Sequence, residues 1–510
     1  MSLISMEFLL FVVTAAAGYY WIPRKYQWIW LLIFSYIYYS SGGIKVTCFL
    51  ALTTVSTWLA GIWIQTLSHK EPDKSRRRQR KRRALVLVLL LNFGVLAILK
   101  YTNFAISTAN AIFGIKQGEL SLLLPLGISF YTFQSMGYIL DVYWEKIKAE
   151  QNLFRFALFV SFFPQILQGP IGRFDKLGRQ LYESHSFDLK RTELSLLRIL
   201  WGYFKKMVIA DNAVIFVDAI FGDPQKYSGL GIVAVLAYSI QLYCDFSGGM
   251  DVVIGIAGLF GIQIDENFKR PYFAVSITDF WHRWHITLGT WMKDYIFYPV
   301  SLSRWMKHFS KFAKKVFGKQ TGRLLPICLA NIIVFLVVGV WHGAAWKFIV
   351  YGLYNGVIIA FSGLMAPKYR NWKQALHISD DSLGFRFFQI LRTFLLVNIS
   401  WFFDRANSVQ AAFQMMKYSL TRFRLSELLT IESGEASGTA YTPIILFVIL
   451  AGCLIVFVVS LLQEQGRDLE SFYGRRHWLV KCVLFAALFL VLPALGQPSG
   501  EAGGFIYAQF

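Results

Sequence analysis

Charged residues are scarce in this chain of 510 residues, where Asp, Glu, Lys and Arg together make up only 16%. By contrast, 55% of the residues are hydrophobic and the mean hydropathy is +0.47. A soluble globular fold of this composition would leave too much apolar surface in water. We therefore predict an all-α polytopic integral membrane protein.

Cysteine is also rare, and its five positions are scattered: Cys48, Cys244, Cys328, Cys453 and Cys482. Their spacing matches neither a disulfide framework nor a metal site, so we expect small core residues. The sequence further lacks a Gly-x-Ser-x-Gly elbow, a phosphate-binding loop and a dinucleotide-binding fingerprint. His-Glu-x-x-His is absent as well. We predict no metal site, although His282 and His285 stand three apart and could share a helix face.

Apolar stretches long enough to cross a hydrocarbon core of about 30 Å recur along the chain. They are Leu3–Trp21, Trp28–Tyr39, Val46–Leu67, Ala84–Lys100, Leu120–Leu140, Met207–Phe221, Ile232–Tyr243, Leu324–Val340, Phe348–Leu364, Phe387–Phe403, Pro443–Leu462 and Trp478–Leu495. Two further stretches, Phe154–Ile171 and Val252–Ile264, are short or interrupted, as in re-entrant or tilted segments. We interpret residues 1–510 as one membrane domain, with N-terminal helices in 1–120, a catalytic core in 121–420 and further helices in 421–510.

The distribution of charge predicts the topology. We predict a loop at Lys70–Arg83, which holds nine Lys or Arg against two acidic residues and which the positive-inside rule places in the cytoplasm. Glu427–Tyr441 and Gln497–Phe510 contain acidic residues but no Lys or Arg. We therefore predict that both face outward and that both termini are extracytoplasmic in a plasma or inner membrane. Leu3–Trp21 lacks a basic leader and a cleavage site, so it is expected to be a retained helix.

The net charge of +21 has more than one possible cause. A basic run can bind nucleic acid, but Lys70–Arg83 lies between two membrane stretches and has no aromatic stacking platform. We expect it to set topology and to contact anionic membrane lipid, and we expect no nucleic-acid partner.

Two histidines lie in otherwise apolar surroundings, His285 within Asp279–Tyr295 and His342 within Val340–Ala345. Ionisable side chains are costly inside a membrane and therefore mark candidate functional sites. The alternative is a pair of core histidines bonded to backbone carbonyls. For His285 this alternative is stronger, because a helical ring of apolar side chains could bury it: Trp281, Trp284, Leu288 and Trp291.

Several motifs resemble those of the membrane-bound O-acyltransferase (MBOAT) family. They are Phe162–Ile171, Gln241–Gly248, Glu266–Tyr272, Phe280–Leu288, Trp341–Trp346, Trp401–Ala406 and Phe505–Phe510. The resemblance runs from about Pro125 to the end, and it is strongest to the bacterial subfamily that includes the membrane subunit of alginate O-acetyltransferase. It implies about 11–13 membrane segments, some re-entrant or tilted, around a central funnel or tunnel.

The resemblance also implies site residues. His342 corresponds to the family's catalytic histidine and His285 to the second polar group, whereas the role of His282 stays open. Acyl transfer from a thioester to a hydroxyl needs a base, and histidine titrates near working pH. Gly343 and Ala344 beside His342 would leave room for substrate. The candidate residues lining the tunnel are Trp341, Trp284, Asp245, Ser247, Arg283 and Asn267.

Other acidic residues are expected to be structural. Five acids have basic neighbours in Lys269, Arg270, Arg283 and Lys293 and should form ion pairs within the core: Asp245, Asp251, Asp265, Glu266 and Asp294. Asp279 and Arg283 stand four apart, so we predict an ion pair between them.

We therefore expect an O-acetyltransferase that needs no bound cofactor. Its donor would be cytoplasmic acetyl-CoA, attracted by the basic segment Arg304–Arg323, with Lys307 and Lys311 as weak candidates for binding it. The acceptor would be extracytoplasmic, and an SGNH-type acetyltransferase partner would relay acetyl to a polysaccharide. Three alternatives stay open: a D-alanyl transferase acting on teichoic acid, a lipid acyltransferase, and, from another class, a polysaccharide exporter or channel.

Overall fold

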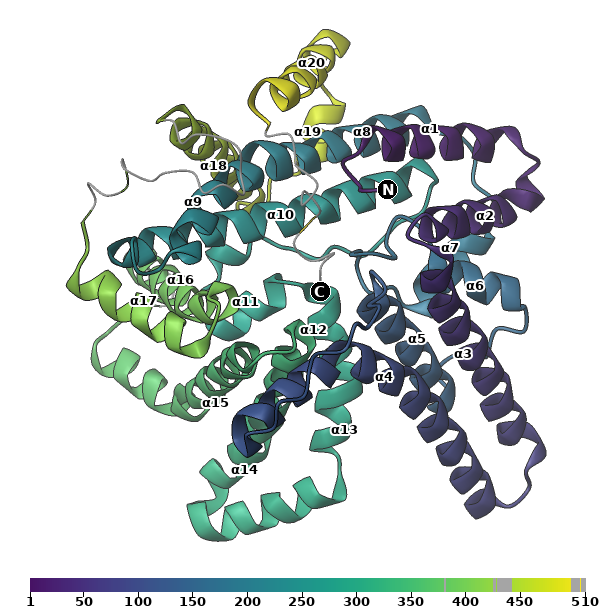
Figure 1. Cartoon of the computed structure of the whole chain (residues 1–510), viewed down its shortest axis with the longest axis horizontal. Helices are drawn as coiled ribbons and strands as arrows, with labels where there is room; N and C mark the ends of the chain where they lie inside the picture. Colours follow the sequence, from purple (N-terminus) through teal and green to yellow (C-terminus); the bar gives the residue numbers. More distant parts are fainter. Residues whose placement is uncertain (380–381, 425–427, 429–442, 497–504, 506–510) are drawn as a thin grey trace. The chain divides into compact units, whose positions relative to one another are not determined.

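The computed structural model describes residues 1–379, 382–424, 428, 443–496 and 505 (Figure 1). These residues are overwhelmingly helical, and the β structure found among them is one antiparallel bridge between Phe268 and Trp284. The described residues form two compact units, one of residues 1–203, 248–266 and 505, and one of the described parts of 204–247 and 267–496. The all-α polytopic class is confirmed. Nearly all of the predicted outward segments Glu427–Tyr441 and Gln497–Phe510 lie outside the described residues.

In the first unit, three helices pack on one buried helix, α5 (Ile128–Tyr143). The unit also contains α1 (Met6–Trp21), α2 (Gln27–Ser40), α3 (Ile44–Lys70), α4 (Lys74–Phe113), α6 (Leu153–Ser161), α7 (Arg179–Tyr182), α8 (Leu189–Tyr203) and the end of α10 (Gly231–Leu259). Both α3 and α4 pack against α5, which is buried on nearly every side. Helix α5 is largely apolar, and its buried polar side chains include Gln134, which donates to the carbonyl of Phe159 on α6 at 2.6 Å.

The second unit carries most of the described helices that are long and apolar enough to cross a membrane. It contains α9 (Asp211–Gly222), the start of α10, α11 (Ile277–Arg283), α12 (Ile286–Met292), α13 (Tyr298–Ser301), α14 (Arg304–His342), α15 (Trp346–Ala375), α16 (Leu383–Arg405), α17 (Val409–Thr421), α18 (Pro443–Glu464), α19 (Leu469–Gly474) and α20 (Trp478–Leu495). Short 3₁₀ turns occur at Arg24–Tyr26, Ser228–Leu230 and η5 (Pro271–Phe273), and π-helical turns at Phe174–Gly178, η3 (Phe204–Ala210) and Lys293–Phe297.

Eight helices of the described ranges are long and apolar enough to cross a membrane: α3, α4, α10, α14, α15, α16, α18 and α20. The apolar α1 is shorter, with 16 residues. Three predicted segments differ from the structure. Met207–Phe221 is divided between η3 and the 12-residue α9, which is too short to be counted among the helices that could cross a membrane. Val252–Ile264 is not a separate piece, because α10 continues unbroken to Leu259. Leu120–Leu140 becomes helical only at Ile128, because Gly127 ahead of it adopts a left-handed conformation with φ of 74°.

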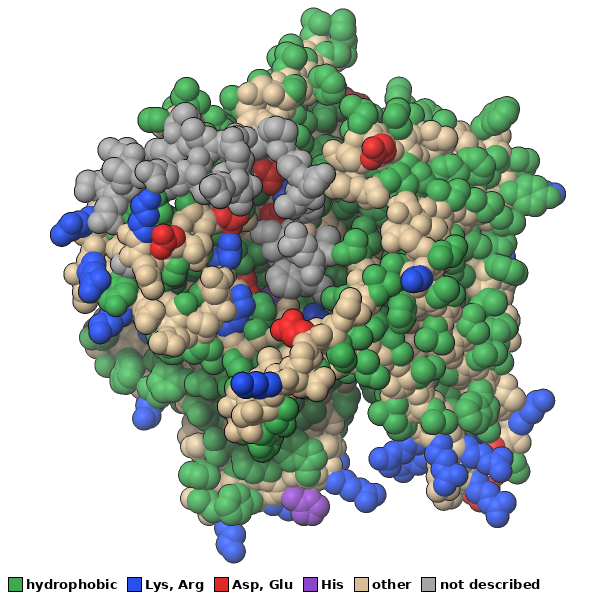
Figure 2. All heavy atoms as spheres, in the orientation of Figure 1, with side chains coloured by type: hydrophobic (Ala, Val, Ile, Leu, Met, Phe, Trp, Pro, Cys, Tyr) green, Lys and Arg blue, Asp and Glu red, His purple; other side chains and the backbone are tan. Residues whose placement is uncertain are grey.

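The basic segment Lys70–Arg83 is not the loop that its charge suggested. Helix α4 starts at Lys74, where the Asp73 carboxylate accepts hydrogen bonds from the backbone N–H groups of Ser75 (2.8 Å) and Arg76 (3.4 Å). Lys, Arg and Gln are strong helix formers, so the capped basic run continues directly into the apolar helix. Figure 2 shows the resulting cluster of Lys and Arg side chains beside the hydrophobic surface of α3 and α4. Its cytoplasmic location stays a prediction.

The cysteines differ in part from expectation. All five are free thiols, and Cys244 and Cys328 are buried as predicted. However, Cys48 and Cys482 are exposed, so the expectation of core positions is wrong for these two. These two cysteines lie on α3 and α20, which are long and apolar enough to cross a membrane. Such a helix normally exposes apolar side chains to lipid, so an exposed cysteine is not unusual there.

Helices α14 and α15 form a close hairpin that carries His342 at its turn (Figure 1). A Cβ added to Gly339 would stand 3.1 Å from the Cα of Gly352, and one added to Gly352 would stand 3.0 Å from the Cα of Gly339. The two glycines therefore let the helix backbones touch, as small residues do between membrane helices. Since α14 ends at His342 and α15 begins at Trp346, this close packing holds the His342 backbone at a defined point.

Candidate functional site

His285 lies in a break between two short helices. Helix α11 ends at Arg283, and the backbone N–H of Lys269 donates to the Arg283 carbonyl (2.9 Å) beside the Phe268–Trp284 bridge. His285 then adopts a left-handed conformation, φ 46° and ψ 53°, before α12 begins at Ile286. A non-glycine residue in this conformation costs free energy, so the surrounding contacts must hold it. His282 belongs to α11, so the two histidines do not share a helix face.

Asn267 supplies the main contacts that hold His285. Its side-chain oxygen accepts from the Thr287 backbone N–H (3.0 Å) and the Thr287 hydroxyl (3.0 Å), and it lies 3.3 Å from His285 Nδ1. The Ile286 N–H also donates to the Asn267 carbonyl (3.0 Å). Because the amide oxygen only accepts hydrogen bonds, His285 Nδ1 must be the donor in this contact. In a neutral ring this leaves the lone pair on Nε2.

His342 faces a carboxylate. Its Nδ1 lies 3.7 Å from Asp404 Oδ1, and both side chains are almost fully buried. The other oxygen of Asp404 accepts a 2.6 Å hydrogen bond from the Tyr238 hydroxyl. Lys347 Nζ donates to the backbone carbonyl of Asp404 (3.0 Å) and to that of Ala406 (2.8 Å), which anchors the end of α16. Four helices, α10, α14, α15 and α16, therefore meet around this carboxylate.

Trp341 brings the two histidines into one site. Its ring centroid is 5.6 Å from that of His285 and 5.2 Å from that of His342. Phe246 packs edge-on against His285 at 4.8 Å, and Tyr351 against His342 at 4.9 Å. Burial lowers the pKa of His285 to about 3, and the charge that His342 can carry contributes to this shift. His285 is therefore neutral at pH 7.

The space beside His342 is not open where the sequence suggested. A side chain at Gly343 would collide with the ring of Phe348, the ring that stacks on His342 with centroids 6.2 Å apart. Gly343 therefore makes room for Phe348 rather than for substrate at this position, and the small residue keeps the hairpin turn compact.

The remaining tunnel candidates have structural contacts. Trp284 is 1% exposed and packs in an aromatic cluster with Phe268, Phe280 and Trp401 at centroid distances of 5.0–5.5 Å. Arg283 pairs with Asp279 at 2.9 Å, which confirms the predicted i,i+4 ion pair.

Asp245 and Ser247 face two lysines of the η3 turn. Lys206 Nζ lies 2.6 Å from Asp245 Oδ1 and 2.7 Å from Asp211 Oδ1, while Lys205 Nζ donates to the Ser247 hydroxyl at 2.8 Å. These groups are buried or nearly so. A buried carboxylate needs such a partner, so the pairing expected for Asp245 is confirmed, but with a lysine that lies 39 residues away.

Ion pairs also form at Asp251, Asp265 and Glu266, but with partners other than those predicted, and the side chains of Asp265 and Glu266 are about half exposed rather than in the core. In the first unit, Arg198 binds Asp251 (3.0 Å) and Glu266 (2.7 Å), and Lys176 binds Asp265 (3.2 Å). In the second unit, Glu464 at the end of α18 collects three guanidinium groups, from Arg270 (2.7 Å), Arg283 (3.1 Å) and Arg386 (3.4 Å). Nearness in sequence was therefore a poor guide to partners, because helix packing decides which charges meet.

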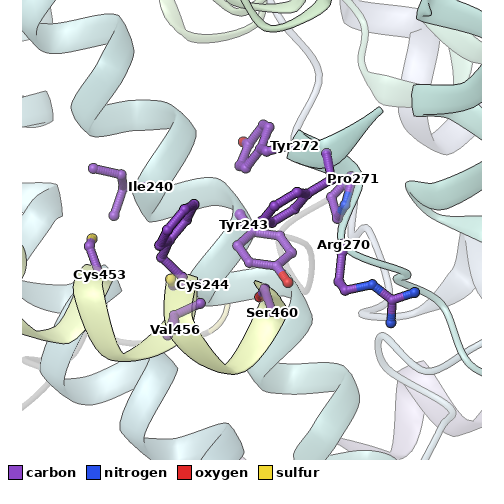
Figure 3. Close-up of a pocket in the computed structure, with 11 residues that line it drawn as sticks. Ile240, Tyr243, Cys244, Arg270, Pro271, Tyr272, Cys453, Val456 and Ser460 are labelled. Atoms are coloured by element: carbon purple, nitrogen blue, oxygen red, sulfur yellow. The ribbon is translucent and has the colours of Figure 1, made fainter. Parts of the chain in front are cut away.

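The second unit also has an apolar pocket of about 540 Å³, including space open to its surroundings (Figure 3). Its walls come from α10, η5 and α18. Neither His285 nor His342 lines it. The rings of Tyr243 and Tyr272 in its wall pack near Trp284, with centroids 6.4 and 6.3 Å from that of Trp284. The buried polar site, not this pocket, carries the candidate chemistry.

Comparison with known proteins identifies the family. The sequence profile of the membrane-bound O-acyltransferase family, MBOAT, matches residues 146–400. A protein of Azotobacter vinelandii named "Probable alginate O-acetylase" is 34% identical over 417 residues, covering 80% of this chain and 76% of the relative. The chain belongs to the MBOAT family. It is an O-acyltransferase, as its motifs predicted.

Two further relatives are named for peptidoglycan and for teichoic acid. A peptidoglycan O-acetyltransferase of Helicobacter pylori is 30% identical over 507 residues, covering 92% of this chain and 90% of the relative. A teichoic acid D-alanyltransferase of Bacillus subtilis is 31% identical over 245 residues, covering 47% of this chain and 59% of the relative.

Two residues of this MBOAT site escaped the sequence analysis. Asp404 lies inside the motif Trp401–Ala406, but nothing in the motif indicates that it faces His342 from another helix. Tyr238 is one of 25 tyrosines, and its spacing from either histidine carries no signal. A buried acid within an apolar helix was the one sequence cue that could have singled out Asp404.

Proposed function

We propose that this O-acyltransferase transfers an acetyl group from acetyl-CoA to a hydroxyl of an extracytoplasmic acceptor, for O-acetylation of a cell-surface or secreted polysaccharide. The observation that carries the proposal is the buried pair of histidines around Trp341, each with its Nδ1 directed at an oxygen acceptor. Such a site can move one proton without a metal-binding cluster. Two relatives that cover most of this chain are named for acetylation of alginate and of peptidoglycan, which supports a polysaccharide product.

His342 would act as the general base. The Asp404 carboxylate can only accept, so it favours the tautomer with hydrogen on Nδ1 and leaves the Nε2 lone pair for the acceptor hydroxyl. The hydroxyl oxygen attacks the thioester carbonyl while its proton moves to Nε2. The C–S bond then breaks, and the thiolate of CoA recovers the proton from His342. Asp404 stabilises the imidazolium that exists between these two steps.

His285 would orient the acceptor. Its Nδ1 is committed to Asn267, so the neutral ring offers a lone pair at Nε2 and can accept a hydrogen bond from an incoming hydroxyl. Polarising the thioester carbonyl would require a donor at Nε2, which means a protonated ring. Since the pKa of His285 is lowered to about 3, the protonated ring is disfavoured, and the orienting role is the better supported of the two.

The proposal includes a relay partner. This chain would hand acetyl to an SGNH-type acetyltransferase outside the membrane, which would modify the polymer. Acetyl-CoA would serve as substrate from the cytoplasmic side.

Substitution of His342 by Gln tests the proposal. Gln preserves much of the side-chain volume but cannot accept and return a proton, so transfer should fall by about 10²–10⁴-fold. The measurement is transfer of radiolabelled acetyl to the acceptor in proteoliposomes, with the melting temperature as a check on folding. His282→Gln is the matched control, because His282 lies on α11 rather than in the helix break. A folded His342→Gln protein with near-normal turnover would mean that His342 is not the base.

The D-alanyl alternative has specific support from the Bacillus subtilis relative, although that match covers less than half of this chain. Cells supplied in turn with labelled acetate and labelled D-alanine separate the two. If the acceptor carries label from D-alanine and none from acetate, and this label is lost in His342→Gln cells, the transferred group is D-alanyl rather than acetyl. The role assigned to His342 would then stand.

A further inference from the structure

We propose that the first part of α14, Arg304–Phe317, lies along the membrane surface and binds anionic phospholipid headgroups. Three observations within the second unit carry this inference: a sharp turn at Gly318, an exposed apolar stripe, and a basic arc that contains no acidic residue.

The turn at Gly318 separates this part from the membrane-crossing part of α14. Gly318 has φ of 79° and ψ of 168°, far from helical values. In a straight helix, residues 314 and 322 would stand about 12 Å apart. Instead, a Cβ on Gly322 would lie 2.5 Å from the backbone nitrogen of Lys314 and 2.7 Å from the carbonyl carbon of Ala313. The first part therefore crosses the base of the second part, as Figure 1 shows at the bottom of the view.

Its side chains divide into three faces. Met306 and Ala313 are 1% and 0% exposed and attach the helix to the protein. Next to them runs an apolar stripe with spacings of four, three and four residues, which keeps one side of a helix. It consists of Trp305, Phe309, Phe312 and Val316, of which Trp305, Phe312 and Val316 are 49%, 58% and 55% exposed.

The third face is strongly basic. Five Lys or Arg side chains occupy the side away from the apolar stripe, all of them exposed: Arg304, Lys307, Lys311, Lys314 and Lys315. The segment contains no Asp or Glu. Figure 2 shows basic side chains gathered at this end of α14 beside hydrophobic ones. The face therefore has a net positive charge that no residue of the segment itself offsets.

A lipid surface fits these features together. A helix whose apolar stripe contains Trp and Phe, and which also carries Lys and Arg, places the stripe among acyl chains and the cations among phosphates. This part of α14 also adjoins the end of the part that is long and apolar enough to cross a membrane, so it would lie next to the bilayer surface. A soluble acidic protein would complement only the basic arc and would leave the exposed stripe in water.

The depth of the stripe can be measured on the whole protein. Cys48 and Cys482 are replaced by Ser, and a single cysteine carrying an environment-sensitive nitrobenzoxadiazole dye is placed at Phe312 or Lys311. The protein is reconstituted in nanodiscs containing phosphatidylcholine with about one third phosphatidylglycerol. Compared with the dye at Lys311→Cys, we expect the emission of the dye at Phe312→Cys to be blue-shifted. We also expect brominated lipid to quench the dye at Phe312→Cys at least several-fold more strongly. Iodide in the water should quench mainly the dye at Lys311→Cys.

Equal access of iodide to both positions would overturn the proposal. So would quenching of the Phe312→Cys dye by a soluble partner protein and not by brominated lipid, because the stripe would then be a protein-docking surface.

The charge on the arc has its own test. In the native sequence, nanodiscs with phosphatidylglycerol should raise the melting temperature above that in pure phosphatidylcholine. Replacing Lys307, Lys311, Lys314 and Lys315 together by Gln should remove most of this difference, whereas the same change at Lys368 and Lys373 on α15 should not. If the fourfold variant keeps the full difference and instead raises the KM for acetyl-CoA, the lysines attract the donor and the proposal fails.

Discussion

Replacement of Asp404 by Asn is the most direct test of how the site works. The variant keeps the size of the side chain and an oxygen that can accept from Tyr238, but it removes the negative charge facing His342. In the proposed mechanism this charge matters only while His342 carries the proton. The change should therefore lower kcat and leave the KM for acetyl-CoA within about threefold.

The structure sets the magnitude. Opposite unit charges 3.7 Å apart attract by about 4 kcal/mol at an effective dielectric constant of about 20. Each 1.4 kcal/mol corresponds to about a tenfold change in rate, so complete loss would slow transfer roughly 10³-fold. The amide dipole retains part of the attraction. We expect a decrease of about 10²–10³-fold.

The assay is single-turnover acetyl transfer from radiolabelled acetyl-CoA in proteoliposomes, with the melting temperature measured in parallel. Tyr238→Phe should have a smaller effect, about tenfold, because it removes the 2.6 Å hydrogen bond but keeps the charge. Asp218→Asn is the matched control, since Asp218 pairs with Arg405 next to Asp404 and is half exposed. An Asp404→Asn protein that folds normally and retains more than a third of the native kcat would refute the role assigned to this carboxylate.

Three further predictions concern other parts of the chain. Gly343→Ala should lower both the stability and the turnover, because the new methyl group collides with Phe348. Overpacking of a core costs about 1–3 kcal/mol. A melting temperature within about 1–2 °C of the native value would therefore contradict this prediction. The pKa of His285 is about 3 in the folded protein and about 6.5 in the unfolded chain. Between these pH values the unfolded chain binds a proton at His285 and the folded protein does not. The free energy of unfolding should therefore fall as the pH decreases from 6.5 toward 3, by at most about 1.4 kcal/mol per pH unit. Melting curves between pH 7 and 5 should therefore show a shallower decline for His285→Gln than for the native protein, and equal slopes would argue against a buried neutral His285. A cysteine at Ser75, in a variant lacking Cys48 and Cys482, should resist an impermeant thiol reagent in intact cells and react after permeabilisation; strong labelling of intact cells would place the basic segment outside.

Local patterns explain what could be inferred about the fold. Hydrophobic runs of sufficient length predict membrane helices whatever their neighbours are, because the bilayer itself is the partner. The runs within α14, α15, α16, α18 and α20 were therefore located correctly. The predicted bounds of α20, Trp478–Leu495, are confirmed, and α18 begins at Pro443 as predicted. The predicted starts of α4 and α14 were wrong, because the basic residues in their first turns are good helix formers and extend these helices beyond the apolar part.

The two histidines could be singled out because polar residues are rare and expensive in such a sequence. The pairing of Asp279 with Arg283 could be predicted too, since four residues span one helical turn. Both inferences depend on spacing of a few residues or on composition, and neither needs a tertiary contact.

Only the tertiary structure decided which groups share the site. Asp404 stands 62 positions after His342 and reaches it because α16 packs against the α14–α15 hairpin, an arrangement that close contact of Gly339 with Gly352 helps to fix. Asn267 reaches His285 through a backbone bridge that the sequence does not signal. The sequence by itself thus determined a membrane protein with two buried histidines, because burial of apolar length is a local property. Which oxygen faces each imidazole, and so which nitrogen can take a proton, depends on how distant helices pack.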